Sequence, residues 1–285
     1  MGLTDTHCHL DMIEDPKIAL LRAKEAGVTT IINVGTSIDA SRQSIEIAEG
    51  TDLVDVYATC GIHAQEGPKD VKKYGSLDKC MEILKEQILN QVQDDKKKVV
   101  GIGECGMDYF LEATDKGEAT SDKQKVEQRE LFEGQVKLAI DLDLPLIIHC
   151  RNAWNETFEL LWTFFGRSSK KGVFHSWSGT VEQAKKALDL GFYISFSGIV
   201  TFKNAGEIAE VAKMVPDDRI LVETDAPFLT PRRGSPSLKF QGASKTNEPK
   251  NVRITAQFLA NLRGISLDEL SGITTGNAKN LFGLT

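Results

Sequence analysis

The sequence lacks any long run of apolar residues. No stretch approaches the roughly 18 uninterrupted apolar residues that a membrane-spanning helix needs. The segment from Met1 to His7 also lacks the basic and apolar regions of a secretory signal peptide. We therefore expect a cytoplasmic protein without a membrane segment, with the nucleus as the alternative compartment.

Cysteine is also scarce, and its spacing is uninformative. The five cysteines are Cys8, Cys60, Cys80, Cys105 and Cys150. No pair has the C-x-x-C spacing of a zinc ribbon, and an odd number without an export signal predicts reduced thiols. Cys8, Cys105 and Cys150 each adjoin a histidine or a glutamate that could bind a metal ion. Because neighbouring side chains on a strand point to opposite faces, we expect these three to be buried in the wall of the fold.

Several catalytic motifs are missing as well. There is no G-x-S-x-G sequence, which removes the anchor of a serine hydrolase, and no phosphate-binding P-loop. The segment from Gly101 to Gly106 has the G-x-G-x-x-G spacing of a dinucleotide-binding loop, but its first two glycines lie inside an expected strand, whereas that loop follows a strand and opens a helix.

The charge balance is acidic. The 285 residues carry a formal net charge of −7, with 41% hydrophobic and 26% charged residues. This composition is that of an ordinary globular protein. The negative charge argues against a protein that coats nucleic acid nonspecifically, but it permits one that binds a few phosphates at a local site.

Short apolar segments alternate with helical patterns along the whole chain. The expected strands are Leu3–Thr6, Thr29–Val34, Asp55–Gly61, Val99–Glu104, Leu144–Cys150, Gly172–Ser176, Tyr193–Ser197 and Ile220–Thr224. Most are continuous apolar runs, which is typical of parallel strands covered by helices. We predict a single-domain (β/α)8 TIM barrel over residues 1–285, with an open doubly wound sheet as the alternative.

Helical patterns fill the intervals. The first helix is expected after Asp15, with Pro16 at its first position and Gly27 past its end. Another, from Gln128 to Asp143, has an apolar stripe at helical spacing. The remaining expected helices are Asp39–Gly50, Leu77–Gln93, Ala153–Phe165, Val181–Leu190, Ala205–Met214, Val252–Arg263 and Leu267–Phe282. Residues 93–98 and 112–124 are polar and are expected to be surface loops.

Polar residues collect where the expected strands end. The active sites of (β/α)8 enzymes lie at this carboxyl-terminal face. All five histidines of the chain belong to this set, together with acidic residues after the fourth and eighth strands: His7, His9, His63, Glu104, His149, His175 and Asp225. Histidines without a shared role would also occur on helices and elsewhere, so we predict a metal site.

The spacing favours two ions. His7 and His9 are two residues apart on a strand, so both imidazoles face the same side. The carboxylate of Glu104 has two oxygens and can bridge two ions. His149 and His175 can complete the second ion, while Asp225 can complete the first or act as a base. Nitrogen and oxygen ligands suit Zn²⁺, Mn²⁺ or Mg²⁺ without choosing among them.

Such a site favours an anionic substrate. The positive charge of two divalent cations exceeds the negative charge of the Glu104 and Asp225 carboxylates. The site would therefore have a net positive charge, and Arg151 adds to it. Paired cations polarise a phosphoryl oxygen and activate water. His63 is not needed as a ligand, and proton donation, orientation of a ligand and packing remain open for it. Trp177 and Tyr109 could stack on a base, but we expect them to pack at the barrel rim.

Five segments resemble those of the TatD family of metal-dependent deoxyribonucleases. They are residues 5–11, 103–109, 145–151, 174–179 and 223–228, and residues 247–249 and 276–282 match as well. The resemblance implies a TIM barrel of the amidohydrolase-like group with two metal ions. It implies His7, His9, Glu104 and Asp225 on one ion, and Glu104, His149 and His175 on the other.

The resemblance also implies an activity. The family is associated with hydrolysis of DNA, including 3′-to-5′ exonuclease action, in DNA repair or DNA degradation, and some members with removal of D-amino acids from tRNA. This chain departs from the family at Gln65, where a second histidine is frequent. It also departs at Thr246, preceded by Lys245, where an arginine is frequent.

Three hypotheses follow. The first is a metal-dependent phosphodiesterase acting on DNA, in which Asp225 accepts a proton and Arg151 or Lys245 binds a phosphate. The second is a deacylase or other amidohydrolase acting on a small or tRNA-linked ester. A bridging glutamate, Glu104, in place of a modified lysine favours the first. The third is a barrel that binds metal structurally and serves in protein interactions.

Overall fold

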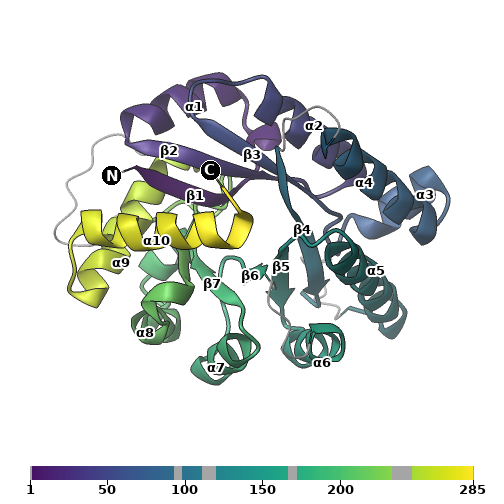
Figure 1. Ribbon diagram of the computed structural model, residues 1–285. Helices are drawn as coiled ribbons and strands as arrows, with labels where there is room; N and C mark the ends of the chain where they lie inside the picture. Colours follow the sequence, from purple (N-terminus) through teal and green to yellow (C-terminus); the bar gives the residue numbers. More distant parts are fainter. Residues whose placement is uncertain (1, 93–97, 111–119, 166–171, 233–245, 285) are drawn as a thin grey trace.

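Eight parallel strands form one sheet in the computed structural model, which describes residues 2–92, 98–110, 120–165, 172–232 and 246–284 (Figure 1). The strands follow one another in the sheet in chain order. They are β1 (Leu3–Cys8), β2 (Val28–Val34), β3 (Asp55–Cys60), β4 (Val99–Asp108), β5 (Leu146–Arg151), β6 (Gly172–Phe174), β7 (Tyr193–Phe196) and β8 (Ile220–Val222).

The first and last strands meet and close the sheet. Cys8 and Ala226 form a parallel bridge. The amide of His9 donates to the carbonyl of Ala226 at 2.7 Å, and the amide of Asp225 donates to the carbonyl of His7 at 2.9 Å. A doubly wound sheet has two open edges and a reversal of strand order. The predicted (β/α)8 barrel is therefore confirmed, and the open alternative is wrong.

The helices surround the strands (Figure 1). They are α1 (Pro16–Glu25), α2 (Ile38–Glu49), α3 (Gly67–Tyr74), α4 (Leu77–Val92), α5 (Asp122–Asp141), α6 (Trp154–Phe165), α7 (Val181–Asp189), α8 (Gly206–Met214), α9 (Val252–Arg263) and α10 (Leu267–Phe282). Short 3₁₀ turns cover Leu10–Met12, Gly198–Thr201, Asp217–Arg219 and Pro249–Asn251. Helix α3 was not predicted, because it has few apolar residues. In the described part of the chain, none of the helices is long and apolar enough to cross a membrane.

Two boundaries differ from the prediction in ways that matter for the site. Strand β4 continues four residues past the predicted end at Glu104, because Gly106 and Asp108 pair with His149 and Arg151 of β5. Helix α5 begins six residues before the predicted start, since Ser121 caps it. The two predicted surface loops fall largely on residues 93–97 and 111–119, outside the described residues.

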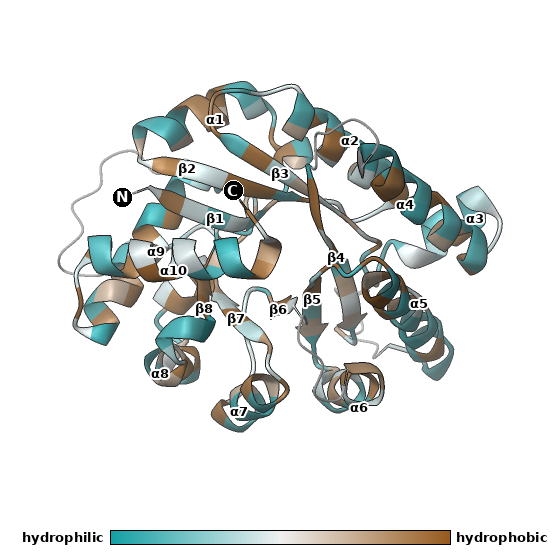
Figure 2. Ribbon diagram, viewed as in Figure 1, coloured by the Kyte–Doolittle hydropathy of each residue, from teal (hydrophilic) through white to brown (hydrophobic). Residues whose placement is uncertain are grey.

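Apolar side chains form two clusters. The larger one lies between strands and helices, and Figure 2 shows apolar residues on the strands and on the helices around them. The smaller one joins inward-facing strand residues such as Ile32, Val100 and Ile147 to Leu281 and Phe282 of α10. Helix α10 therefore closes the amino-terminal end of the barrel, as a capping or flanking role predicted. All five cysteines are buried and free.

A matched pair of glycine substitutions tests the close approach of β4 and β5. Gly106 has φ +136°, and a Cβ atom there would lie 1.9 Å from the carbonyl oxygen of His149. Gly276, in α10, has open space around it. We expect Gly106→Ala to lower the free energy of unfolding by roughly 3 kcal/mol or more. Gly276→Ala should raise it by about 0.5–1 kcal/mol. Urea unfolding of both variants measures this, and a Gly106→Ala protein as stable as the wild type would contradict it.

Candidate metal centre

The predicted site residues meet at the carboxyl-terminal ends of the strands. His7 lies in β1, Glu104 in β4 and His149 in β5, while four further residues follow strands: His9, His63, His175 and Asp225. The predicted cluster, which comes from six different strands, is therefore a single group of neighbours. Arg151 ends β5 beside it, whereas Lys245 lies outside the described residues.

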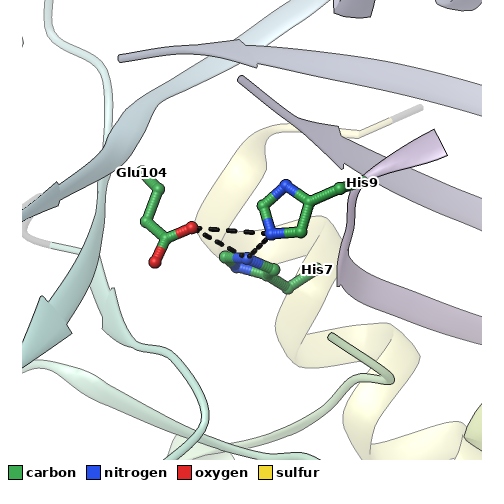
Figure 3. A group of neighbouring side chains, drawn as sticks. All are labelled: His7, His9 and Glu104. Carbon is green, nitrogen blue, oxygen red and sulfur yellow. Dashed lines mark hydrogen bonds and ion pairs between the residues drawn. The ribbon is translucent and has the colours of Figure 1, made fainter. Parts of the chain in front are cut away.

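Four polar atoms form the first group. The Nε2 atoms of His7 and His9 are 3.1 Å apart. They lie 3.4 and 3.6 Å from Oε2 of Glu104. Dashed lines in Figure 3 mark the contacts among these three side chains. Oδ1 of Asp225 lies 3.6 Å from Nε2 of His7 and 3.5 Å from Nε2 of His9. His7, His9 and Glu104 are all buried.

These separations fit one cation. Two ligand atoms, each about 2.1 Å from a tetrahedral ion, lie about 3.4 Å apart. The Nδ1 atom of His9 lies 2.9 Å from the carbonyl oxygen of Val34. Donation of that proton leaves Nε2 with its lone pair directed at the group. Lone pairs from two imidazoles and two carboxylates thus converge in a buried space, which a positive ion would neutralise.

A second group lies on the other oxygen of Glu104. Its Oε1 atom is 3.1 Å from Nδ1 of His149 and 3.0 Å from Nε2 of His175. The two imidazole nitrogens are themselves 3.2 Å apart. Each oxygen of one buried carboxylate therefore belongs to a different group of ligand atoms. The donor set fits two divalent cations, and it contains no cysteine.

Buried partners orient the ligands, and the sequence reasoning assigned them no role. Glu223 accepts a hydrogen bond from the Ser176 amide at 2.7 Å and lies 3.3 Å from Nδ1 of His175. Asp5 accepts hydrogen bonds from the amide and the hydroxyl of Thr224, at 2.9 and 2.6 Å. Thr224 precedes Asp225, so Asp5 ties β1 to the segment that holds Asp225. Asp5 and Glu223 both lie within the segments that resemble the family, and this is the sequence signal that could have identified them.

Carboxylates and histidines of the site shift one another's pKa values toward the charged forms. Burial raises the pKa of Glu104, but His175 and a hydrogen bond with His149 outweigh it and hold the pKa well below its ordinary value. Burial lowers the pKa of His9, but the carboxylates of Asp225 and Glu104 outweigh it and raise the pKa to about 9. Burial likewise opposes a charge on His175, yet Glu104 and Glu223 raise its pKa well above the ordinary value.

His63 behaves differently from these ligands. Burial lowers its pKa to about 4, against the opposing effect of Glu104, so the ring is neutral at pH 7. The backbone amide of Gln65 lies 3.2 Å from the Nδ1 atom of His63 and donates a hydrogen bond to it. The proton of the neutral ring is then on Nε2, which lies 3.6 Å from Oε1 of Glu104. His63 therefore presents an N–H donor toward the second group.

Arg151 is held at the rim by Asp108. Its Nε donates to Oδ1 of Asp108 at 3.1 Å, and its guanidinium stacks 3.9 Å from the ring centroid of Phe110. Asp108 also lies 3.3 Å from Nε2 of His149 and accepts from Gln65 at 2.9 Å. Gln65, one of the departures from the family pattern, thus has a structural role. Asp108 is paired with the guanidinium of Arg151 and lies beside His149, so it fixes the position of both.

The two aromatic residues named from the sequence are not available at the mouth. Trp177 is 1% exposed, and its indole nitrogen donates to the carbonyl of Gly179. Tyr109 is partly buried and packs against the main apolar cluster. The expected packing role of both is confirmed.

Comparison with known proteins agrees with this geometry. The profile of one family, described as TatD related DNase, matches residues 4–283. The chain belongs to the TatD-related DNase family. An uncharacterized metal-dependent hydrolase of Bacillus subtilis, YabD, is 36% identical, and the match covers 98% of each chain. The 3′-5′ ssDNA/RNA exonuclease TatD of Citrobacter rodentium is 29% identical, over 96% of this chain and 94% of the relative.

A solved structure gives the same result. The TatD homologue YjjV of Escherichia coli superposes with a TM-score of 0.79 at 30% identity, over 99% of this chain and 98% of the other. Family membership and the ligand groups together make this TatD-family chain a metal-dependent hydrolase acting on ester bonds.

Metal binding should release protons at neutral pH. In the metal-free protein, His9 keeps its proton up to a pKa of about 9. An ion requires the neutral imidazole, so binding displaces that proton, and the apparent affinity should rise with pH up to about pH 9. Calorimetric titration of the apoprotein with Zn²⁺ or Mn²⁺, in two buffers that differ in ionisation enthalpy, counts the protons. An affinity independent of pH between 7 and 9 would contradict this assignment.

Proposed function

We propose that this TatD-family chain is a deoxyribonuclease that hydrolyses DNA phosphodiester bonds at a binuclear metal centre, from the 3′ end. His7, His9, Glu104 and Asp225 would hold one cation. Glu104, His149 and His175 would hold the other. The proposal includes a role in DNA repair or DNA degradation, in the cytoplasm or nucleus, which agrees with five free cysteines.

One observation carries the proposal. Oε2 of Glu104 lies within 3.6 Å of imidazole nitrogens of His7 and His9, whereas Oε1 lies within 3.1 Å of imidazole nitrogens of His149 and His175. When bound, two such cations polarise a phosphoryl oxygen and make a water nucleophilic at neutral pH. A phosphodiester, with its negative charge, suits this centre better than a neutral ester does. A relative of similar length carries the name of a 3′-5′ exonuclease.

Residues of the chain supply the remaining steps. Asp225 is ionised because His9 and His7 outweigh the effect of burial and lower its pKa, so it can accept a proton from the attacking water. Arg151, fixed by Asp108 and 37% exposed, binds a phosphate oxygen from the rim. The N–H of His63 donates a hydrogen bond to a phosphate oxygen or to the leaving group. Lys245, the other predicted phosphate contact, stays a prediction.

Glu104→Gln tests the central role of the carboxylate. The amide keeps the shape but offers one oxygen and no charge, so we expect kcat on single-stranded DNA to fall by at least about 100-fold. The metal content should fall too, while the melting temperature of the metal-free protein changes little, because the barrel core does not include Glu104. Retained nuclease activity, or wild-type activity that persists after chelation, would refute the proposal.

The substrate class is decided in the same assay. DNA and D-aminoacyl-tRNA are offered to the wild-type protein at matched concentrations with Mg²⁺, Mn²⁺ or Zn²⁺. Hydrolysis of the aminoacyl ester without cleavage of DNA would replace the nuclease with the deacylase. A Glu104→Gln protein without hydrolytic activity that preserves every cellular role would favour an interaction module instead.

His63→Gln separates proton donation from metal binding. Because the histidine is neutral and presents an N–H, we expect kcat to fall roughly 100-fold while the metal content stays that of the wild type. Loss of a metal ion in this variant, measured by elemental analysis, would show that His63 is a ligand.

A further inference from the structure

An exposed aromatic ring stands beside the first ligand group. Phe228 follows Asp225 by three residues, and its side chain is 50% exposed. Its ring centroid lies 6.0 Å from that of His9, in an edge-to-face arrangement. A phenylalanine that is half exposed loses the stabilisation that burial would give. Its place next to a ligand of the metal centre calls for a functional account.

The backbone of Phe228 is held rigidly although the ring is exposed. Its amide donates to the carbonyl of Asp225 at 2.8 Å. Its own carbonyl accepts from the side chain of Asn247 at 2.6 Å, and the same amide group donates to the carbonyl of Thr224 at 2.8 Å. Asn247 is fully buried. The ring is therefore presented on a fixed turn, which lowers the entropy lost when a ligand binds to it.

Among the described residues, the other aromatic side chains near the mouth are already engaged. Trp177 is buried. Tyr109 packs on the core and has Lys125 5.4 Å from its ring centroid. Phe110 has the guanidinium of Arg151 on its face, on the β4–β5 side of the barrel. Phe228 lies on the opposite side, next to β8 and β1, and among the described residues no guanidinium or ammonium covers its face.

We propose that Phe228 is a base-stacking platform for the nucleotide next to the scissile phosphate. This inference rests on the proposed nuclease function. Phosphate oxygens would be bound on the Arg151 side and at the cations, and the adjoining base would lie on the ring of Phe228. In the interior of a duplex both faces of a base are covered by its neighbours, so this surface favours a base that is unstacked on one side, as in a single strand. Stacking is tolerant of sequence, because every base has a π-face.

The test compares intact and abasic substrates. Single-stranded oligonucleotides are prepared with normal bases, or with abasic sites on both sides of the terminal phosphodiester. We expect wild-type kcat/KM to be roughly 5- to 100-fold higher for the intact oligonucleotide, mainly through KM. Phe228→Ala and Phe228→Leu should remove most of this preference and leave the abasic rate unchanged, whereas Phe228→Trp should retain it. The leucine keeps apolar packing and removes the aromatic face.

A matched control lies far from the mouth. Trp162, on α6, is 64% exposed. It lies in the second half of a helix that runs away from the mouth. Trp162→Ala should keep the full preference for the intact oligonucleotide.

The proposal fails if Phe228→Ala keeps the wild-type preference. It also fails if the variant slows cleavage of intact and abasic oligonucleotides equally, since a merely structural role would do that. Metal content and melting temperature of each variant identify such a role. A wild-type protein that cleaves neither oligonucleotide in the presence of divalent cations would instead overturn the nuclease function itself.

Discussion

The site depends on one negative charge that is kept inside the barrel. Glu104 is 4% exposed, and a carboxylate in such a place is unstable unless positive charge surrounds it. His9, His149 and His175, from three strand ends, supply that charge when protonated, and cations replace those protons when bound. The arrangement of strand ends, the buried orienting carboxylates and the tight packing of β4 on β5 all serve to hold ligand atoms around this group.

The orienting residues explain how such a site stays in place. Asp5 and Glu223 are fully buried, and each is joined to a backbone amide just past the end of a strand. Asp108 joins a ligand, His149, to the rim cation Arg151. Two layers of polar groups thus connect the metal centre to the strands, so ligand geometry follows from backbone geometry rather than from flexible side chains.

Much of this was readable in the sequence. Apolar strands, alternating helices and five histidines at strand ends predicted the barrel and the cluster, because strand ends share one face in this fold. Helix α5 was placed too late since its first turns face solvent and carry little apolar pattern, although Ser121 and Gln124 form a capping box. The extent of β4 was missed because pairing with β5, not local composition, decides it. Phe228 was missed because exposure cannot be read from sequence.

The way α10 closes the barrel bears on how the chain folds. Leu281 and Phe282 complete the inner apolar cluster, and Thr275 of the same helix is hydrogen-bonded to Thr4 in the first strand. These contacts join segments that are 271 residues apart in the sequence. During synthesis the first strand can pair with β2 early, but its contacts with α10 and with the segment after β8 form only once those segments exist, and the apolar interior stays open until then. Sequence-distant contacts of this kind slow folding and prolong the time in which a nascent barrel depends on protection from aggregation.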